Sequence, residues 1–96
     1  MQNLSAEQVR VLLDRGNQPR PIVLDVREKW EYENKHIPDS LHIPMGELSH
    51  RLDMIESERQ VIVVCEHGVR SYQVAIYLEH IGWKDVINLK GGISSW

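Results

Sequence analysis

The sequence predicts a small three-layer α/β domain, in which a central, mostly parallel sheet is covered by helices on both faces. Segments with helical periodicity alternate along the chain with short, nearly unbroken apolar runs, and such runs are typical of strands buried on both faces. Hydrophobic residues make up 42% of the 96 residues but aromatic residues only 6%, with no Phe. Valine, isoleucine and leucine must therefore fill the core. The alternation implies parallel strands joined by right-handed crossovers.

The first predicted element is a surface helix over residues 5–15, capped by Ser5 or Asn3. Its apolar face consists of Val9, Leu12 and Leu13. Gly16, followed by an asparagine, is expected to end this helix. The next segment, Pro21–Val26, is short and almost wholly apolar, which predicts a strand buried on both faces.

The middle of the chain predicts shorter elements. Lys29–Asn34 is predicted to be a short helix and His36–Asp39 a turn, followed by a strand over Ser40–Ile43 that Pro44 stops. A further helical stretch over residues 47–55 is expected from the spacing of Glu47, Leu48, Arg51, Leu52 and Ile55.

The last third of the chain predicts two strands and a helix between them. Val61–Val64 is an apolar, β-branched run, and Tyr72–Ile81 has helical spacing with Gly82 as its stop. Asp85–Leu89 is predicted to be the final strand, and Ile93–Trp96 the beginning of a helical turn. We expect one domain over residues 1–96, and the position of that turn leaves open whether the C-terminus is truncated.

Composition excludes several classes of function. A formal charge of -3, without a basic stretch, argues against nucleic acid or an anionic membrane as the partner. One cysteine cannot form an internal disulfide, and the five histidines lack zinc-finger spacing, so we assign no metal. Because the sequence has no signal peptide pattern or apolar run of about 18 residues, we expect a soluble, cytoplasmic monomer.

Cys65, the only cysteine, directly follows the predicted strand Val61–Val64. Ligand sites in open α/β sheets form just beyond the carboxyl ends of strands. The polar segment after Cys65 contains Gly68, which allows the backbone to curl so that successive N–H groups converge on one point. A small buried hydrophobe is the alternative role for a free cysteine. The polar, glycine-containing loop favours an exposed, reactive thiol.

The predicted anion-binding loop consists of Glu66, His67, Gly68, Val69, Arg70 and Ser71. Arg70 is expected to place a cation at the rim. Ser71 is expected to cap a helix that starts at Tyr72, whose N-terminus carries roughly half a positive charge towards the sulfur. His67 is predicted either to donate to an anion and tune Cys65 or to be an exposed residue without a role.

Five segments in this order resemble a single-domain rhodanese. They are Leu24–Arg27, Trp30–Tyr32, His36–Pro44, Val63–Cys65 with its loop, and Leu89–Trp96. The resemblance covers nearly the whole chain. It implies a rhodanese-like fold and a sulfurtransferase without cofactor, in which Cys65 takes a sulfane sulfur from thiosulfate or a persulfide. The persulfide then passes this sulfur to cyanide, a thiol or a protein acceptor.

The same resemblance suggests that Asp25 and Arg27, at the end of a predicted strand, brace the neighbouring loops. A local ion pair is the alternative. The three tryptophans, Trp30, Trp83 and Trp96, are expected to be packing anchors, with Trp30 also a candidate for the mouth of the site.

Loop length separates the possible reactions. Dual-specificity phosphatases and arsenate reductases that share this fold have a loop one residue longer, with an arginine six positions after the cysteine. Here Arg70 stands five positions after Cys65. A smaller cradle suits one sulfur atom better than a tetrahedral phosphate, so sulfur transfer is favoured. A non-catalytic binding or regulatory module remains the second hypothesis.

Glu66 does not fit a thiosulfate-using site well. A carboxylate beside the cysteine is expected to repel a dianionic donor, which indicates that thiosulfate is a poor substrate. The effect disappears if Glu66 points to solvent or pairs with Arg70. Persulfides on small thiols or on partner proteins are the alternative donors.

Overall fold

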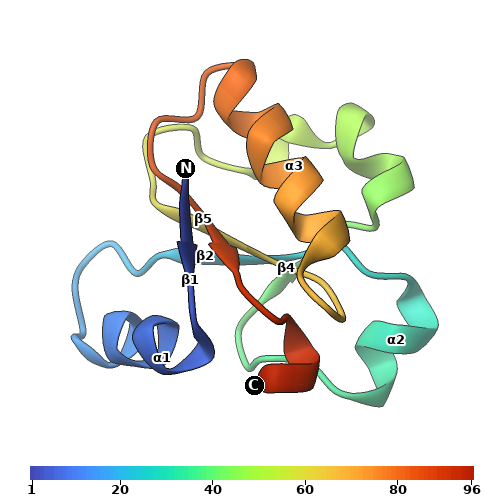
Figure 1. Ribbon diagram of the computed structural model, residues 1–96. Coiled ribbons are helices and arrows are strands. Elements are labelled where there is room, and N and C mark those ends of the chain that lie inside the picture. The colour runs from blue at the N-terminus through green and yellow to red at the C-terminus, as the bar shows by residue number, and fades with distance from the viewer.

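A computed structural model describes residues 1–96 and contains a five-stranded parallel sheet with the strand order β1-β5-β4-β2-β3 (Figure 1). The strands are β1 (Gln2–Leu4), β2 (Ile22–Asp25), β3 (Leu41–His42), β4 (Val61–Val64) and β5 (Val86–Leu89). The α-helices are α1 (Ala6–Asp14), α2 (Lys29–Asn34) and α3 (Val69–His80). Three 3-10 helices complete the chain: η1 (Met45–His50), η2 (Leu52–Met54) and η3 (Ile93–Ser95).

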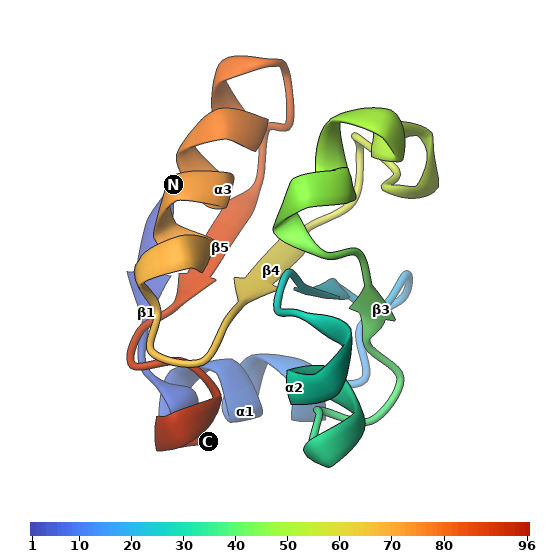
Figure 2. The same ribbon diagram turned by 90° about the vertical axis from the view of Figure 1, so that its right-hand side faces the viewer.

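Helices cover both faces of the sheet, as predicted. Alternate residues of β4 point to opposite faces, so Val61 and Val63 belong to one buried cluster while Ile62 and Val64 belong to the other. The first cluster packs against α3, η1 and η2, and the second packs against α1 and η3 (Figures 1 and 2). The result is the three-layer α/β arrangement that the alternation of apolar runs indicated.

The N-terminal edge strand β1 was not predicted. Gln2–Leu4 pairs in parallel with β5, with Gln2 opposite Ile87 and Leu4 opposite Leu89. Gln2 and Asn3 of this short edge strand are exposed, so the segment contains no apolar run that would predict a strand. The capping box at Ser5 and the left-handed Gly16 confirm the predicted start and end of α1.

The stretch 47–55 is not one α-helix. It forms two 3-10 helices, η1 and η2, that meet at Arg51, where the backbone leaves helical geometry with φ near -130°. The predicted strand over Ser40–Ile43 is reduced to Leu41–His42. The backbone N–H groups of Ile43 and Met45 bond to carbonyls of β2 and Val26 instead, which ties this segment to the end of β2.

The prediction that α3 starts at Tyr72 is wrong, and so is the prediction that Ser71 is its cap. The helix begins at Val69, and its N-cap is Gly68 in a left-handed conformation with φ of 90°. A side chain at Gly68 would place a Cβ 2.9 Å from the backbone nitrogen of Gly91. Glycine therefore permits both the left-handed turn and the close approach of the chain after β5.

Of the predicted packing anchors, Trp83 is buried and Trp96 is partly buried beneath the guanidinium of Arg10, which lies 3.9 Å from the ring centroid. Trp30 is 72% exposed, so its prediction as a packing anchor is wrong. None of the helices has the length and apolar character that crossing a membrane requires.

Candidate active site

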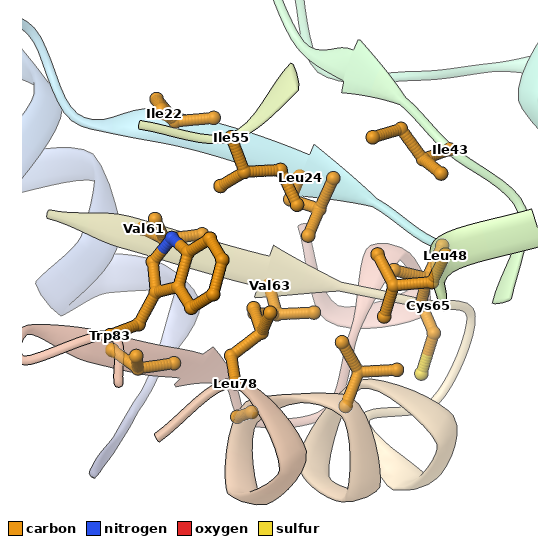
Figure 3. Packing of buried hydrophobic residues seen from close by; sticks show 14 residues of the cluster. Ile22, Leu24, Ile43, Leu48, Ile55, Val61, Val63, Cys65, Leu78 and Trp83 are labelled. Carbon is orange, nitrogen blue, oxygen red and sulfur yellow. The ribbon is translucent and has the colours of Figure 1, made fainter. Parts of the chain in front are cut away.

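Cys65 lies directly after β4, at the carboxyl end of the sheet, and it is only 1% exposed. It belongs to the buried cluster beneath α3, and Figure 3 shows it at the end of that cluster where Leu48 is also labelled. The expected exposure of this thiol is therefore wrong. A purely apolar role is also excluded, because the Sγ atom makes three polar contacts.

These contacts come from the first turn of α3. The backbone N–H groups of Gly68 and Ser71 donate to Sγ at 3.1 and 3.2 Å. The thiol in turn donates to Ser71 Oγ at 3.2 Å. The sequence predicted that successive N–H groups of the loop converge on the sulfur, and those of Gly68 and Ser71 do so. They form a small cradle that stabilises negative charge on the sulfur.

The back of the loop is held by the segment after β5. The N–H groups of Ile93 and Ser94 donate to the carbonyls of Cys65 and Glu66 at 2.8 and 3.0 Å. Gly92 lies so close that a Cβ there would overlap both carbonyl oxygens. The first two carbonyls of the loop are thereby paired with η3, away from the sulfur.

Arg27 is buried and joins the end of β2 to the cysteine loop. It bonds to Asp25 at 2.9–3.2 Å, to Glu66 Oε1 at 3.0 Å and to the carbonyl of Lys35 at 2.6 Å. Burial alone lowers the pKa of Arg27, but the hydrogen bonds and charges of Asp25 and Glu66 raise it above the ordinary value. Both suggested conformations of Glu66, towards solvent or towards Arg70, are wrong.

Arg70 is paired with Glu31 of α2. The guanidinium makes two hydrogen bonds to the two carboxylate oxygens, each 2.9 Å long. These bonds from Arg70 are the main reason that the pKa of Glu31 falls from 4.5 to about 2, and the same carboxylate raises the pKa of Arg70. Sequence reasoning missed Glu31, which lies on a different helix, 39 residues before Arg70 in the sequence.

The site therefore contains two arginines and three carboxylates in two separate ion-paired groups. Arg27 pairs with Asp25 and Glu66, and Arg70 pairs with Glu31. Together these five side chains carry one more negative than positive charge, and both cations already have carboxylate partners. An anionic substrate would have to compete with these pairs.

Asn88 is a second residue that sequence reasoning missed. It lies in β5 and is 2% exposed. Ser71 Oγ donates to Asn88 Oδ1 at 2.5 Å, and Asn88 Nδ2 donates to the carbonyl of Gly68 at 3.3 Å. The sequence contains a signal, because a polar amide inside an otherwise apolar strand needs buried partners.

The remaining loop residues do not contact the sulfur. His67 is exposed and its Nδ1 lies 3.3 Å from Ser94 Oγ, and Val69 is 67% exposed. His36 and His42 each stack on Tyr32. No three histidine, cysteine or carboxylate side chains gather in a group with the geometry to hold a metal ion.

Comparison with known proteins agrees with this geometry. The sequence model of the rhodanese-like domain family matches residues 5–96. A thiosulfate sulfurtransferase GlpE of Coxiella burnetii is 37% identical over 75 residues, which cover 78% of this chain and 70% of the relative. A sulfurtransferase of Allochromatium vinosum is 39% identical over the same length, with the same coverage.

Among solved structures, a rhodanese-related protein from Thermoplasma volcanium superimposes with a TM-score of 0.88 at 29% identity. The superposition covers 100% of this chain and 90% of that protein.

Proposed function

This chain belongs to the rhodanese-like domain family, and we propose that it is a sulfurtransferase which carries a sulfane sulfur as a persulfide on Cys65. The observation that carries this proposal is the pair of backbone N–H groups, from Gly68 and Ser71, that donate to a buried Sγ atom. Such donors stabilise a negative sulfur without protonating it.

In the proposed reaction the Cys65 thiolate attacks the outer sulfur of the donor. The bond between that sulfur and the rest of the donor breaks, and the departing group, sulfite or a thiolate, takes the electron pair. The product is a Cys65 persulfide with its charge on the outer sulfur. A thiolate or cyanide then attacks this outer sulfur, and Cys65 leaves as a thiolate. No metal or organic cofactor takes part.

The loop supports sulfur rather than phosphate as the transferred group. The helix N-terminus closes on Sγ itself through Ser71, and Arg70 is held by Glu31. Phosphoryl transfer needs donors and cations arranged around three oxygen atoms. A cradle this small, with its arginine already paired, fits a single sulfur atom better.

The charges around the site favour a donor of low charge. The excess carboxylate belongs to the group of Asp25, Arg27 and Glu66, and Glu66 is the residue next to Cys65. A thiosulfate dianion is repelled more strongly than a neutral or singly charged persulfide. We therefore propose a persulfide on a small thiol or a protein as the preferred donor, and a thiol, cyanide or a protein thiol as the acceptor.

The proposed setting follows from the same chemistry. A single free thiol that must stay reduced suits the cytoplasm. We propose that the chain acts there as one rhodanese-like domain and as a monomer.

Intact-protein mass spectrometry tests the proposal. We expect the protein to gain the mass of one sulfur atom after incubation with a low-molecular-weight persulfide, and to lose it after cyanide is added. A Cys65→Ser variant, which keeps the size of the side chain, should gain nothing while its thermal unfolding stays similar. A wild-type protein that is folded and reduced but gains no sulfur would favour the alternative, a non-catalytic binding module.

A further inference from the structure

The side chain of Asn88 is buried within β5 and points to the face of the sheet that α3 covers. Its neighbours Ile87 and Leu89 point to the opposite face, into the cluster beneath α1. The amide therefore lies under the first turn of α3, where it contacts Ser71 and the carbonyl of Gly68. A buried amide is tolerated only where its donors and acceptor are paired.

The orientation of this amide follows from its partners. The carbonyl of Gly68 can only accept, so the Nδ2 group of Asn88 must face it. Asn3 Oδ1, at 2.8 Å, accepts from the same nitrogen. The Oδ1 atom of Asn88 is thereby left facing Ser71. An oxygen of this kind cannot donate, so the Ser71 hydroxyl must supply the proton of that bond.

This direction determines what Ser71 offers to Cys65. A hydroxyl has one proton, and the proton of Ser71 is committed to Asn88. The lone pairs of Ser71 Oγ are then available to the sulfur at 3.2 Å, where they accept the S–H of a thiol. They would repel a thiolate. If the hydroxyl turned to donate to a thiolate, the buried Oδ1 atom of Asn88 would lose its donor.

We propose that Asn88 is a positioning residue that fixes the Ser71 hydroxyl as an acceptor and so favours the thiol form of the resting Cys65. The backbone donors of Gly68 and Ser71 still stabilise the thiolate and the persulfide. Asn88 therefore shifts the equilibrium between the thiolate and the thiol form of Cys65 towards the thiol. This role depends on the proposed sulfur chemistry for its purpose, but its test does not require sulfur transfer.

The only cysteine allows a direct measurement. The ultraviolet absorbance of the protein, to which the Cys65 thiolate contributes, is measured as a function of pH. The curve of the Cys65→Ser variant is then subtracted, and the midpoint of the difference is the midpoint of Cys65 ionisation. We expect the midpoint of Asn88→Val to fall by about one pH unit, because the freed hydroxyl can donate to the thiolate. Valine suits a buried strand and is similar in size. Asn34→Leu, at the exposed end of α2, is the matched control and should keep the wild-type midpoint.

A second variant tests whether Asn88 acts through Ser71. Ser71→Ala removes the acceptor of the thiol, so its midpoint should also fall, by less than in Asn88→Val. In the Ser71→Ala background the Asn88→Val substitution should have no further effect. A midpoint that rises in Ser71→Ala, stays unchanged in Asn88→Val, or falls equally with Asn88→Val in both backgrounds would overturn the proposal.

The other charged groups near Cys65 are the same in all of these variants. They are Glu66 and His67 of the loop, Arg70 of α3, Asp25 at the end of β2, Arg27 after that strand, and Glu31 of α2. A shift of the Cys65 midpoint in these variants therefore reports the effect of the Ser71 hydroxyl and the Asn88 amide. If the titration follows the proposal while no persulfide forms on the wild-type protein, the proposed function fails and the role of Asn88 stands.

Discussion

At the scale of single residues, the candidate site is defined by what each charged side chain is already bound to. Glu66 directly follows Cys65, and its side chain is 34% exposed while Arg27 holds one of its oxygens. A carboxylate in this position changes the local potential without touching the sulfur. Its effect should therefore depend on the charge of the donor.

Replacing Glu66 by Gln tests this dependence. The amide oxygen can still accept from Arg27, so the loop should keep its conformation. We expect the rate of Cys65 persulfide formation from thiosulfate to rise by about tenfold, from the lost repulsion of a dianion. The rate from an uncharged persulfide should change by less than about twofold.

Both rates are measured by quenching the two loading reactions at successive times and recording the intact-protein mass. Glu33→Gln, on the exposed side of α2, removes the same charge away from the ion pairs and serves as the control. Equal acceleration with both donors, or none with thiosulfate, would show that Glu66 does not select by charge.

Sequence reasoning located Cys65 because its position after an apolar strand is a local feature. It could not identify the partners of Glu66 and Arg70. Arg27 and Glu31 are each 39 residues away from the residues that they pair with, and no periodicity in one segment reports on such a separation. The start of α3 was placed three residues too late, because Gly68 begins the helix in a left-handed turn that packs against the distant Gly91.

At the scale of elements, α2 is attached to the first turn of α3 by the ion pair of Glu31 and Arg70. α2 has only six residues, and an isolated helix of this length is not stable in water. The ion pair is largely removed from solvent on the side of Glu31. It therefore couples the position of α2 to the position of the sulfur-binding turn.

The pKa of Glu31 gives this coupling a pH dependence. Folding lowers the pKa of Glu31 from 4.5 to about 2, so the carboxylate stabilises the folded state above its ordinary pKa. This contribution is lost as the pH falls from about 4.5 towards about 2. The free energy of unfolding of the wild type should exceed that of Glu31→Gln at neutral pH, and the difference should shrink in acid.

Urea unfolding at neutral pH and at about pH 2.5 measures this difference. Glu33→Gln, two residues along α2 from Glu31 but exposed, should show little difference from the wild type at either pH. A gap between wild type and Glu31→Gln that is as large in acid as at neutral pH would contradict the assignment.

At the scale of the whole molecule, the two ends of the chain complete the fold. The first strand pairs with β5, and the last residues, η3, pack beneath the sheet beside α1 (Figure 1). The alternation of elements predicted the sheet and its layers. It did not predict β1 or the role of η3 behind the cysteine loop, because both depend on contacts between distant parts of the chain.

Ile93 is the buried residue of η3, with 4% of its surface exposed. Ile93→Ala should cost about 2–4 kcal/mol of the free energy of unfolding, since a buried branched side chain is lost from the cluster beneath α1. Ile81→Ala, at the end of α3 where the side chain is 40% exposed, should cost about 1 kcal/mol or less.

Thermal and urea unfolding of the two variants provide the comparison. Equal losses in the two variants would mean that η3 does not contribute to the core as its burial indicates.

The hydrogen bonds from the N–H groups of Ile93 and Ser94 to the carbonyls of Cys65 and Glu66 have one more consequence. These two amides exchange their hydrogens with solvent only when they part from the loop, so their exchange rates measure how often the loop opens. Since Cys65 is almost fully covered in the closed form, we expect that a donor in the proposed reaction reaches the sulfur only when this loop has opened. The hydrogen-exchange rates of two amides that take no part in the proposed reaction would therefore measure how often the Cys65 sulfur becomes accessible.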